Sequence, residues 1–176
     1  MATTVAPSSV ASEPVQFPGD GVSVTGFLAR PVPARYGASP THQLPFGCPA
    51  VLVLHEWWGL NEQIKQAARR FAEAGFVALV PDLYSRYGRT VTADPQEASA
   101  LMAALSSQWA LRDLNAATQY LKARPFADPL RVGVVGFSMG GMLALMLAGH
   151  NSDLKAAVAF YAKTPPIETF AYSLCP

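Results

Sequence analysis

The stretch Val132-Gly133-Val134-Val135-Gly136-Phe137-Ser138-Met139-Gly140-Gly141 decides the fold of this chain. An apolar run leads into a serine with a glycine two positions before it and another two positions after it, and the residues that follow are almost all apolar. A strand, the string Gly-x-Ser-x-Gly and a helix, in that order, form a nucleophile elbow, a tight turn that exposes one side chain. Glycines suit this turn because a Cβ at either position would collide with the backbone. The pattern therefore predicts that Ser138 is a nucleophile; the alternative is an ordinary serine cap of a helix.

The same motif indicates which groups would stabilise an oxyanion formed by attack of Ser138. The N–H of Met139 lies at the start of the helix, where the helix dipole favours negative charge. A second donor is expected from the loop His55–Asn61, because it leaves the first core strand at the sheet edge where ligands of open α/β sheets bind. We expect the N–H of Trp57 to be that donor. The alternative is that the aromatic residues of this loop only pack, which is the interpretation we favour for Trp58.

Apolar runs alternate with amphipathic segments along most of the chain. Strands are expected around residues 22–28 and over 51–54, 76–80, 131–136 and 156–160. Helices are expected from Asn61 to Gly75, from Asp94 onward, over residues 111–121, and from Met139 to about His150. Asparagine and aspartate are favoured helix caps, and glycine commonly ends a helix. The alternation predicts an α/β fold with a mostly parallel, doubly wound sheet.

Composition argues against several classes of partner. The formal net charge is +1 and only 14% of residues are charged, which gives no electrostatic reason to expect binding to nucleic acid or an acidic membrane. The apolar stretch around 142–148 is too short to cross a bilayer. Residues 1–13 lack the positive charge of a secretion signal and are expected to form a flexible terminus. Cys48 and Cys175 have neither metal-site spacing nor a disulfide framework. We therefore expect a cytoplasmic protein that uses no metal or organic cofactor.

Four motifs together resemble the dienelactone hydrolase family. They are His55-Glu56-Trp57-Trp58-Gly59-Leu60-Asn61, Val80-Pro81-Asp82-Leu83-Tyr84, Arg112-Asp113-Leu114-Asn115-Ala116-Ala117 and Val132 to Gly141. Their order and spacing are similar to those of the family from about residue 20 onward. The resemblance implies the α/β-hydrolase fold and the hydrolysis of esters and lactones through a nucleophile–His–Asp triad. It also implies that Glu56 contacts the resting nucleophile and helps to activate it; the alternative is a solvated loop residue.

Two departures from the family pattern bear on the chemistry. The best-known members use cysteine where this chain has Ser138, and serine depends more heavily on a base because its pKa is much higher. Members specific for dienelactone present an arginine to the substrate carboxylate, whereas this chain has Ser99, Leu101 and Met102 in that region. This difference argues against dienelactone itself as the substrate. Arg86 and Arg89 are candidates for an anion site, although exposed loop arginines usually bind nothing.

The residues after Ser138 contain little that would activate it. The only histidine is His150 and the only aspartate is Asp153, in the wrong order for this fold. Twelve helical residues separate Ser138 from His150, about 18 Å along the axis, whereas a general base must come within about 3 Å. Of the earlier histidines, His42 lies in a loop and the side chain of His55 is expected to face away.

Family members continue after a segment like Cys175-Pro176 into a strand, a loop with the aspartate, a helix and a loop with the histidine. The resemblance therefore implies that residues 14–176 form a partial α/β-hydrolase domain, truncated at its C-terminus. The alternative is a complete domain in which residues 161–176 close the sheet differently. We expect hydrolysis of a small-molecule ester or lactone through an acyl-Ser138 intermediate, impaired because the triad partners are absent. The rival hypotheses are a non-catalytic binding protein and another acyl hydrolase of the same fold, such as a carboxylesterase or peptidase. The sequence does not predict the oligomeric state.

Overall fold

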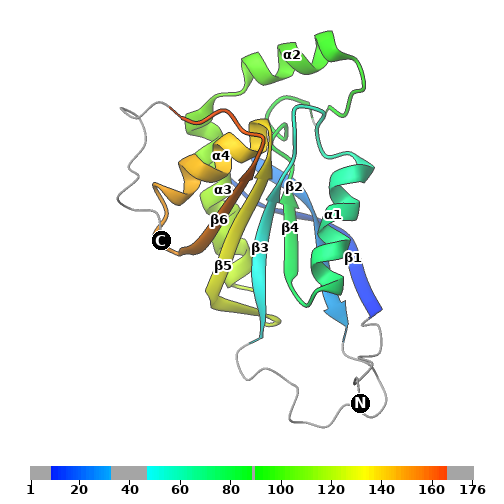
Figure 1. The fold of residues 1–176 in the computed structure, drawn as a ribbon, viewed down its shortest axis with the longest axis vertical. Coiled ribbons are helices and arrows are strands. Elements are labelled where there is room, and N and C mark those ends of the chain that lie inside the picture. Colours follow the sequence, from blue (N-terminus) through cyan, green and yellow to red (C-terminus); the bar gives the residue numbers. More distant parts are fainter. Residues whose placement is uncertain (1–8, 33–46, 89, 166–176) are drawn as a thin grey trace.

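A six-stranded sheet with helices on both faces forms the body of the molecule (Figure 1). The computed structural model describes residues 9–32, 47–88 and 90–165. The strands are β1 (Ser9–Pro18), β2 (Ser23–Val32), β3 (Cys48–Leu54), β4 (Val77–Pro81), β5 (Ala127–Phe137) and β6 (Leu154–Phe160), in the spatial order β1-β2-β4-β3-β5-β6. The helices are α1 (Glu62–Glu73), α2 (Pro95–Ala104), α3 (Ser107–Lys122) and α4 (Met139–Ala148). Strands β4, β3, β5 and β6 are parallel, while β1 and β2 add an antiparallel edge, which confirms the mostly parallel sheet.

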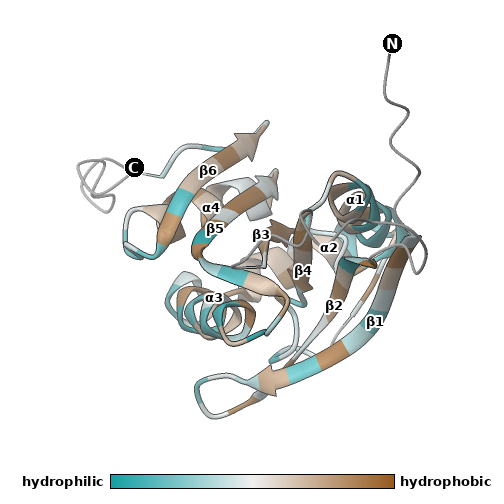
Figure 2. Cartoon of the chain, turned by 90° about the horizontal axis from the view of Figure 1, so that it is seen from below, coloured by the Kyte–Doolittle hydropathy of each residue, from teal (hydrophilic) through white to brown (hydrophobic). Residues whose placement is uncertain are grey.

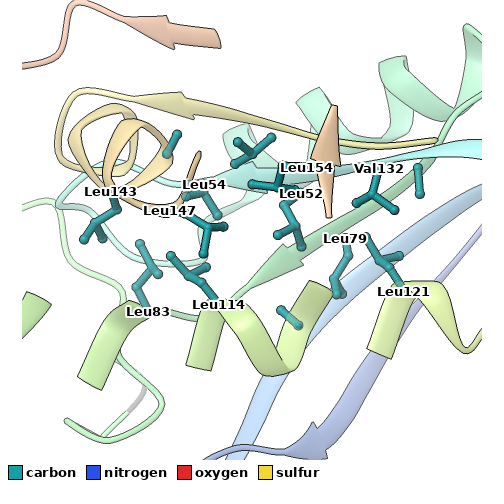
Figure 3. Close-up of a cluster of buried hydrophobic side chains, with 14 of the residues drawn as sticks. Leu52, Leu54, Leu79, Leu83, Leu114, Leu121, Val132, Leu143, Leu147 and Leu154 are labelled. Atoms are coloured by element: carbon teal, nitrogen blue, oxygen red, sulfur yellow. The ribbon is translucent and has the colours of Figure 1, made fainter. Parts of the chain in front are cut away.

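Successive residues of the central strands bury opposite sides of the sheet. Figure 2 shows α1 and α3 on opposite sides. Leu52 and Leu54 of β3 face α3 and α4, where they pack with Leu114 and Leu147 in the larger core (Figure 3). The intervening residues of β3 pack under α1 in a second, smaller core. Full burial on both faces explains why these strands have continuous apolar sequences. In the described ranges, no helix has the length and apolar character needed to cross a membrane.

The predicted helix signals act as expected. The side chain of Asn61 accepts a hydrogen bond from the N–H of Ile64 at 3.1 Å, which caps α1. Gly75 follows the end of α1 with φ +94°, a conformation that L side chains rarely adopt. Asp94 accepts from the N–H of Gln96 at 2.9 Å and so caps α2. These caps satisfy backbone donors that have no partner inside the helix.

The first strand begins earlier than the composition suggests. Residues 9–13 belong to β1, inside the segment expected to be a flexible terminus; residues 1–8 lie outside the described part of the chain. Strand β1 pairs with β2 along its whole length, from Ser9 opposite Val32 to Pro18 opposite Ser23. The hydrogen bonds to β2 stabilise β1, although the composition of β1 does not predict a strand. Within β1, Phe17 is the buried residue.

One part of the sheet is uncovered on the α1 side. Helix α1 packs on strands β1 to β4 and leaves β5 and β6 beyond it. In the described residues of β6, Val158 and Phe160 are therefore 48% and 47% exposed. Both strands end at the edge of the sheet below α2 (Figure 1), and the predicted nucleophile Ser138 directly follows the end of β5.

Candidate active site

Ser138 occupies a sharp turn between β5 and α4. Its φ of 51° and ψ of −114° lie in a region that few non-glycine residues adopt. Its N–H donates to the carbonyl of Phe160 at 3.0 Å, which ties the turn to the end of β6. The side chain is half-buried and, within the described part of the chain, has no hydrogen-bond partner; in particular it does not cap α4. The alternative of an ordinary helix cap is therefore not supported, and an unpartnered, half-buried hydroxyl in this strained turn agrees with the predicted elbow.

The glycines around Ser138 permit a close approach of backbone to backbone. A Cβ on Gly140 would lie 2.5 Å from the carbonyl oxygens of Leu54 and His55, and a Cβ on Gly136 would overlap the carbonyl of Gly140. A Cβ this close to backbone carbonyl oxygens could be accommodated only if the main chain moved. The glycines therefore bring the start of α4 against the end of β3, where the loop that begins at His55 leaves the sheet.

The two predicted oxyanion donors start from adjacent strands. Leu54 pairs with Gly136, so the loop with Trp57 and the turn before Met139 leave the same edge of the sheet. Tyr84 is buried between them: its hydroxyl donates to the carbonyl of Trp57 at 3.0 Å and lies 3.6 Å from Sδ of Met139. Among the described residues, neither the N–H of Trp57 nor that of Met139 has an acceptor. Both amides therefore lack an acceptor in the described part of the chain, and their role in binding an oxyanion stays a prediction.

His55 is a structural residue at this edge. Its side chain is only 1% exposed. The Nδ1–H group donates to the carbonyl of Glu56 at 2.6 Å, and Nε2 accepts from the N–H of Leu83 at 3.1 Å. Burial lowers the pKa of His55 and outweighs the opposing effects of the Glu56 carbonyl and of the Asp82 carboxylate, 3.9 Å away. A neutral ring with both nitrogens engaged joins two loops and is not free to act as a base.

This burial makes the stability of the protein sensitive to acid. The folded-state pKa of His55 lies below the ordinary value of 6.5, so the unfolded chain binds more protons as the pH falls through that value. We expect His55 to leave the free energy of unfolding unchanged above pH 6.5 and to lower it below that pH. For each pH unit below 6.5, the equilibrium constant for unfolding should rise by a factor approaching ten. Urea unfolding from pH 5 to 8 would measure this. His55→Gln should reduce the dependence, whereas His150→Gln, at an exposed position, should retain it; equal slopes in all three proteins would contradict the assignment.

Glu56 lines the same cavity as Phe137, the residue before Ser138, and is bound by a residue that the sequence did not indicate. The hydroxyl of Tyr161 donates to Oε1 of Glu56 at 3.0 Å. In the described ranges no hydrogen bond joins Glu56 to Ser138, so the contact implied by the family resemblance is not seen. Glu56 and Tyr161, with Phe71 and Phe137, line a cavity of about 650 Å³ between α1 and the end of β5. The sequence feature that could have indicated Tyr161 is its position directly after a predicted strand, at the edge of the sheet where ligands bind in this class of fold.

The other candidate side chains that the structure describes make hydrogen bonds or ion pairs with residues outside the candidate site. Arg86 makes two hydrogen bonds to Asp113, at 2.7 and 2.8 Å, and a third to a backbone carbonyl, so it is not a free anion site. Arg89 lies outside the described residues. His150 follows the far end of α4, where Nδ1 bonds the carbonyl of Met146 at 2.7 Å. Asp153 pairs with Lys122 at 2.7 Å. The length of α4 separates His150 from the elbow, as predicted, and Asp153 is engaged by Lys122.

Comparisons with known proteins agree with the motifs. The family model described as the dienelactone hydrolase family matches residues 34–173. A protein of Methylorubrum extorquens, provisionally named carboxymethylenebutenolidase, is 38% identical over 134 residues, covering 75% of this chain and 45% of that protein. One of the same name from Escherichia coli K12 is 36% identical over 165 residues, covering 90% of this chain and 59% of that protein. The chain spans about half the length of the curated relatives it matches.

Solved structures show the same arrangement of the sheet and helices. A crystal structure from Klebsiella pneumoniae, provisionally titled a dienelactone hydrolase, matches with a TM-score of 0.77 and 29% identity, covering 90% of this chain and 62% of that one. A dienelactone hydrolase-like promiscuous phosphotriesterase from metagenomic libraries matches with a TM-score of 0.72 and 27% identity, covering 89% of this chain and 61% of that one. These matches confirm the fold predicted from the sequence.

Proposed function

The chain belongs to the dienelactone hydrolase family, and we propose that it carries the nucleophile-bearing part of a hydrolase for carboxylic esters or lactones. The observation that supports this most directly is the conformation of Ser138: a positive φ between a buried strand and a helix, with an unpartnered, half-buried hydroxyl. The proposed chemistry uses only groups of the protein and a small-molecule substrate.

In the proposed reaction, Oγ of Ser138 attacks the carbonyl carbon of the ester. The carbonyl oxygen becomes an oxyanion that accepts hydrogen bonds from the N–H groups of Trp57 and Met139, and each such donor typically lowers the barrier by about 3 kcal/mol. Glu56 assists removal of the hydroxyl proton, which finally leaves on the departing alcohol. Water then attacks the acyl-Ser138 intermediate, releases the acid and restores the hydroxyl.

The rate expected of the 176-residue chain is low. Serine needs a base. Among the described histidines neither His55 nor His150 can serve, because the first is buried and engaged and the second lies beyond α4; His42 lies outside the described residues. An oxyanion site and substrate binding without a triad retain only about 10³- to 10⁴-fold acceleration over water. We therefore propose slow hydrolysis by these residues alone.

The cations near the site are paired or exposed to solvent, which favours a neutral substrate. Arg70 of α1 lines the cavity, but its side chain is exposed, and water and salt screen the attraction between exposed charges. A dienelactone carries a carboxylate that needs a cationic partner, but Arg86 is already paired with Asp113. Helix α2 contains no arginine or lysine. We propose that the substrate is an uncharged ester or lactone.

A substrate panel tests this function. We expect kcat/KM to be at least about tenfold higher for p-nitrophenyl acetate and dihydrocoumarin than for an anionic dienelactone or a peptide p-nitroanilide, because an unpaired buried charge or a poorer leaving group raises the barrier. Preferential hydrolysis of the anilide would instead identify a peptidase of this fold. No hydrolysis of any substrate, together with no covalent labelling of Ser138, would identify a non-catalytic binding protein.

A further inference from the structure

The last residue of β6, Phe160, and the residue after it, Tyr161, connect the two halves of the candidate site. The carbonyl of Phe160 accepts from the N–H of Ser138, and the next residue, Tyr161, donates its hydroxyl to Glu56; both bonds are 3.0 Å long. Two consecutive residues therefore hold the backbone of the candidate nucleophile and the side chain of the candidate activating group.

Tyr161 is held in an unusual backbone conformation. In the described residues, Ser138 and Tyr161 are the two non-glycine residues with positive φ, at 51° and 41°. Such a conformation is rare for an aromatic residue and persists where surrounding contacts hold it. Tyr161 is 69% exposed, so core packing does not hold it. Its contacts are the bond to Glu56 and the ring of Phe137, which lies 6.2 Å away and itself stacks on Phe160.

The direction of the hydrogen bond follows from the ionisation of the tyrosine. Partial burial and the neighbouring Glu56 raise the pKa of Tyr161 above its ordinary value of 10, so its hydroxyl is protonated at neutral pH. It therefore donates to the carboxylate. The backbone carbonyl of Glu56 is bound in turn by the ring of His55 at 2.6 Å. Glu56 is thus fixed at both ends, and the next N–H in the chain is that of Trp57.

We propose that Tyr161 is a positioning residue for Glu56. Its hydroxyl holds the carboxylate in the cavity that Phe137 also lines and, through Glu56, fixes the amide of Trp57, the proposed oxyanion donor. This inference rests on the proposed function, since it assigns Tyr161 a part in the attack by Ser138.

The rate at which a fluorophosphonate labels Ser138 tests the proposal. We expect Tyr161→Phe to lower the second-order labelling rate about tenfold, because small displacements of groups around a reacting centre have effects of this size or larger. Its melting temperature should equal that of the wild-type chain. In the Glu56→Ala background, Tyr161→Phe should change the rate no further, since the group it positions is gone. Tyr120→Phe, the same change on α3 at the opposite face of the sheet, should label like wild type.

The outcomes separate this inference from the function on which it rests. A wild-type chain that is not labelled at Ser138 would overturn the proposed function. A labelled wild type with an unchanged rate in Tyr161→Phe would overturn only the role of Tyr161. Independent, multiplicative effects of Tyr161→Phe and Glu56→Ala would also overturn it, as would a loss of labelling that parallels a loss of thermal stability.

Discussion

Ser138→Ala is expected to abolish covalent labelling by a fluorophosphonate and to remove the slow hydrolysis of p-nitrophenyl acetate. The reagent transfers its phosphorus to a serine oxygen and releases fluoride, so it reports a hydroxyl that can attack. Ser138 presents a half-buried hydroxyl that has no hydrogen-bond partner among the described residues, whereas alanine presents none. Intact mass would show loss of the added phosphonyl group, and peptide mapping would locate it in the wild-type chain.

Ser106 provides a matched control for this experiment. It is an ordinary helix cap, whose side chain accepts from the N–H of Trp109 at the start of α3. Ser106→Ala should therefore lower the free energy of unfolding by about 1 kcal/mol and leave labelling unchanged. Labelling that survives Ser138→Ala would contradict the assignment of the nucleophile, and an unlabelled wild-type chain would favour the binding-protein hypothesis.

The parts of the fold that the sequence predicts well have local causes. The buried strands follow from continuous apolar runs such as Val51–Leu54, and α1 follows from the cap Asn61 and the terminating Gly75. The elbow signal includes Gly136, whose Cβ would meet the carbonyl of Gly140 only four residues further along the chain. In each case the residues that determine the structure are close together in the chain.

The parts that the sequence does not predict depend on contacts between distant residues. Strand β1 forms because it pairs with β2, so its polar composition gives little signal. The bond between Tyr161 and Glu56 joins residues 105 positions apart. The neutral state of His55 depends on burial and on the N–H of Leu83, 28 residues away. No periodicity encodes such pairs, and they decide which of the candidate side chains are free to react.

Gly136→Ala is expected to destabilise the protein by more than about 3 kcal/mol and to prevent labelling of Ser138. The added Cβ would overlap the carbonyl of Gly140, and this is backbone that no rotamer change can move away. The turn must open to admit the methyl group, which withdraws the start of α4 from the end of β3 and separates the amides of Met139 and Trp57.

Gly133→Ala is the matched control, since it makes the same change three residues earlier on β5. Its Cβ would lie 3.3 Å from the nearest atom, the carbonyl oxygen of Ala156, and a shift of a few tenths of an ångström would relieve this contact. Urea unfolding and the labelling rate should therefore separate the two variants. Gly133→Ala should have a free energy of unfolding and a labelling rate near those of the wild type, whereas Gly136→Ala should have low values of both. Similar stabilities would show that the glycine of the elbow is not required by close packing. Normal labelling of a destabilised Gly136→Ala would show that the reactivity of Ser138 does not depend on this turn, because the strain would then have been absorbed elsewhere in the fold.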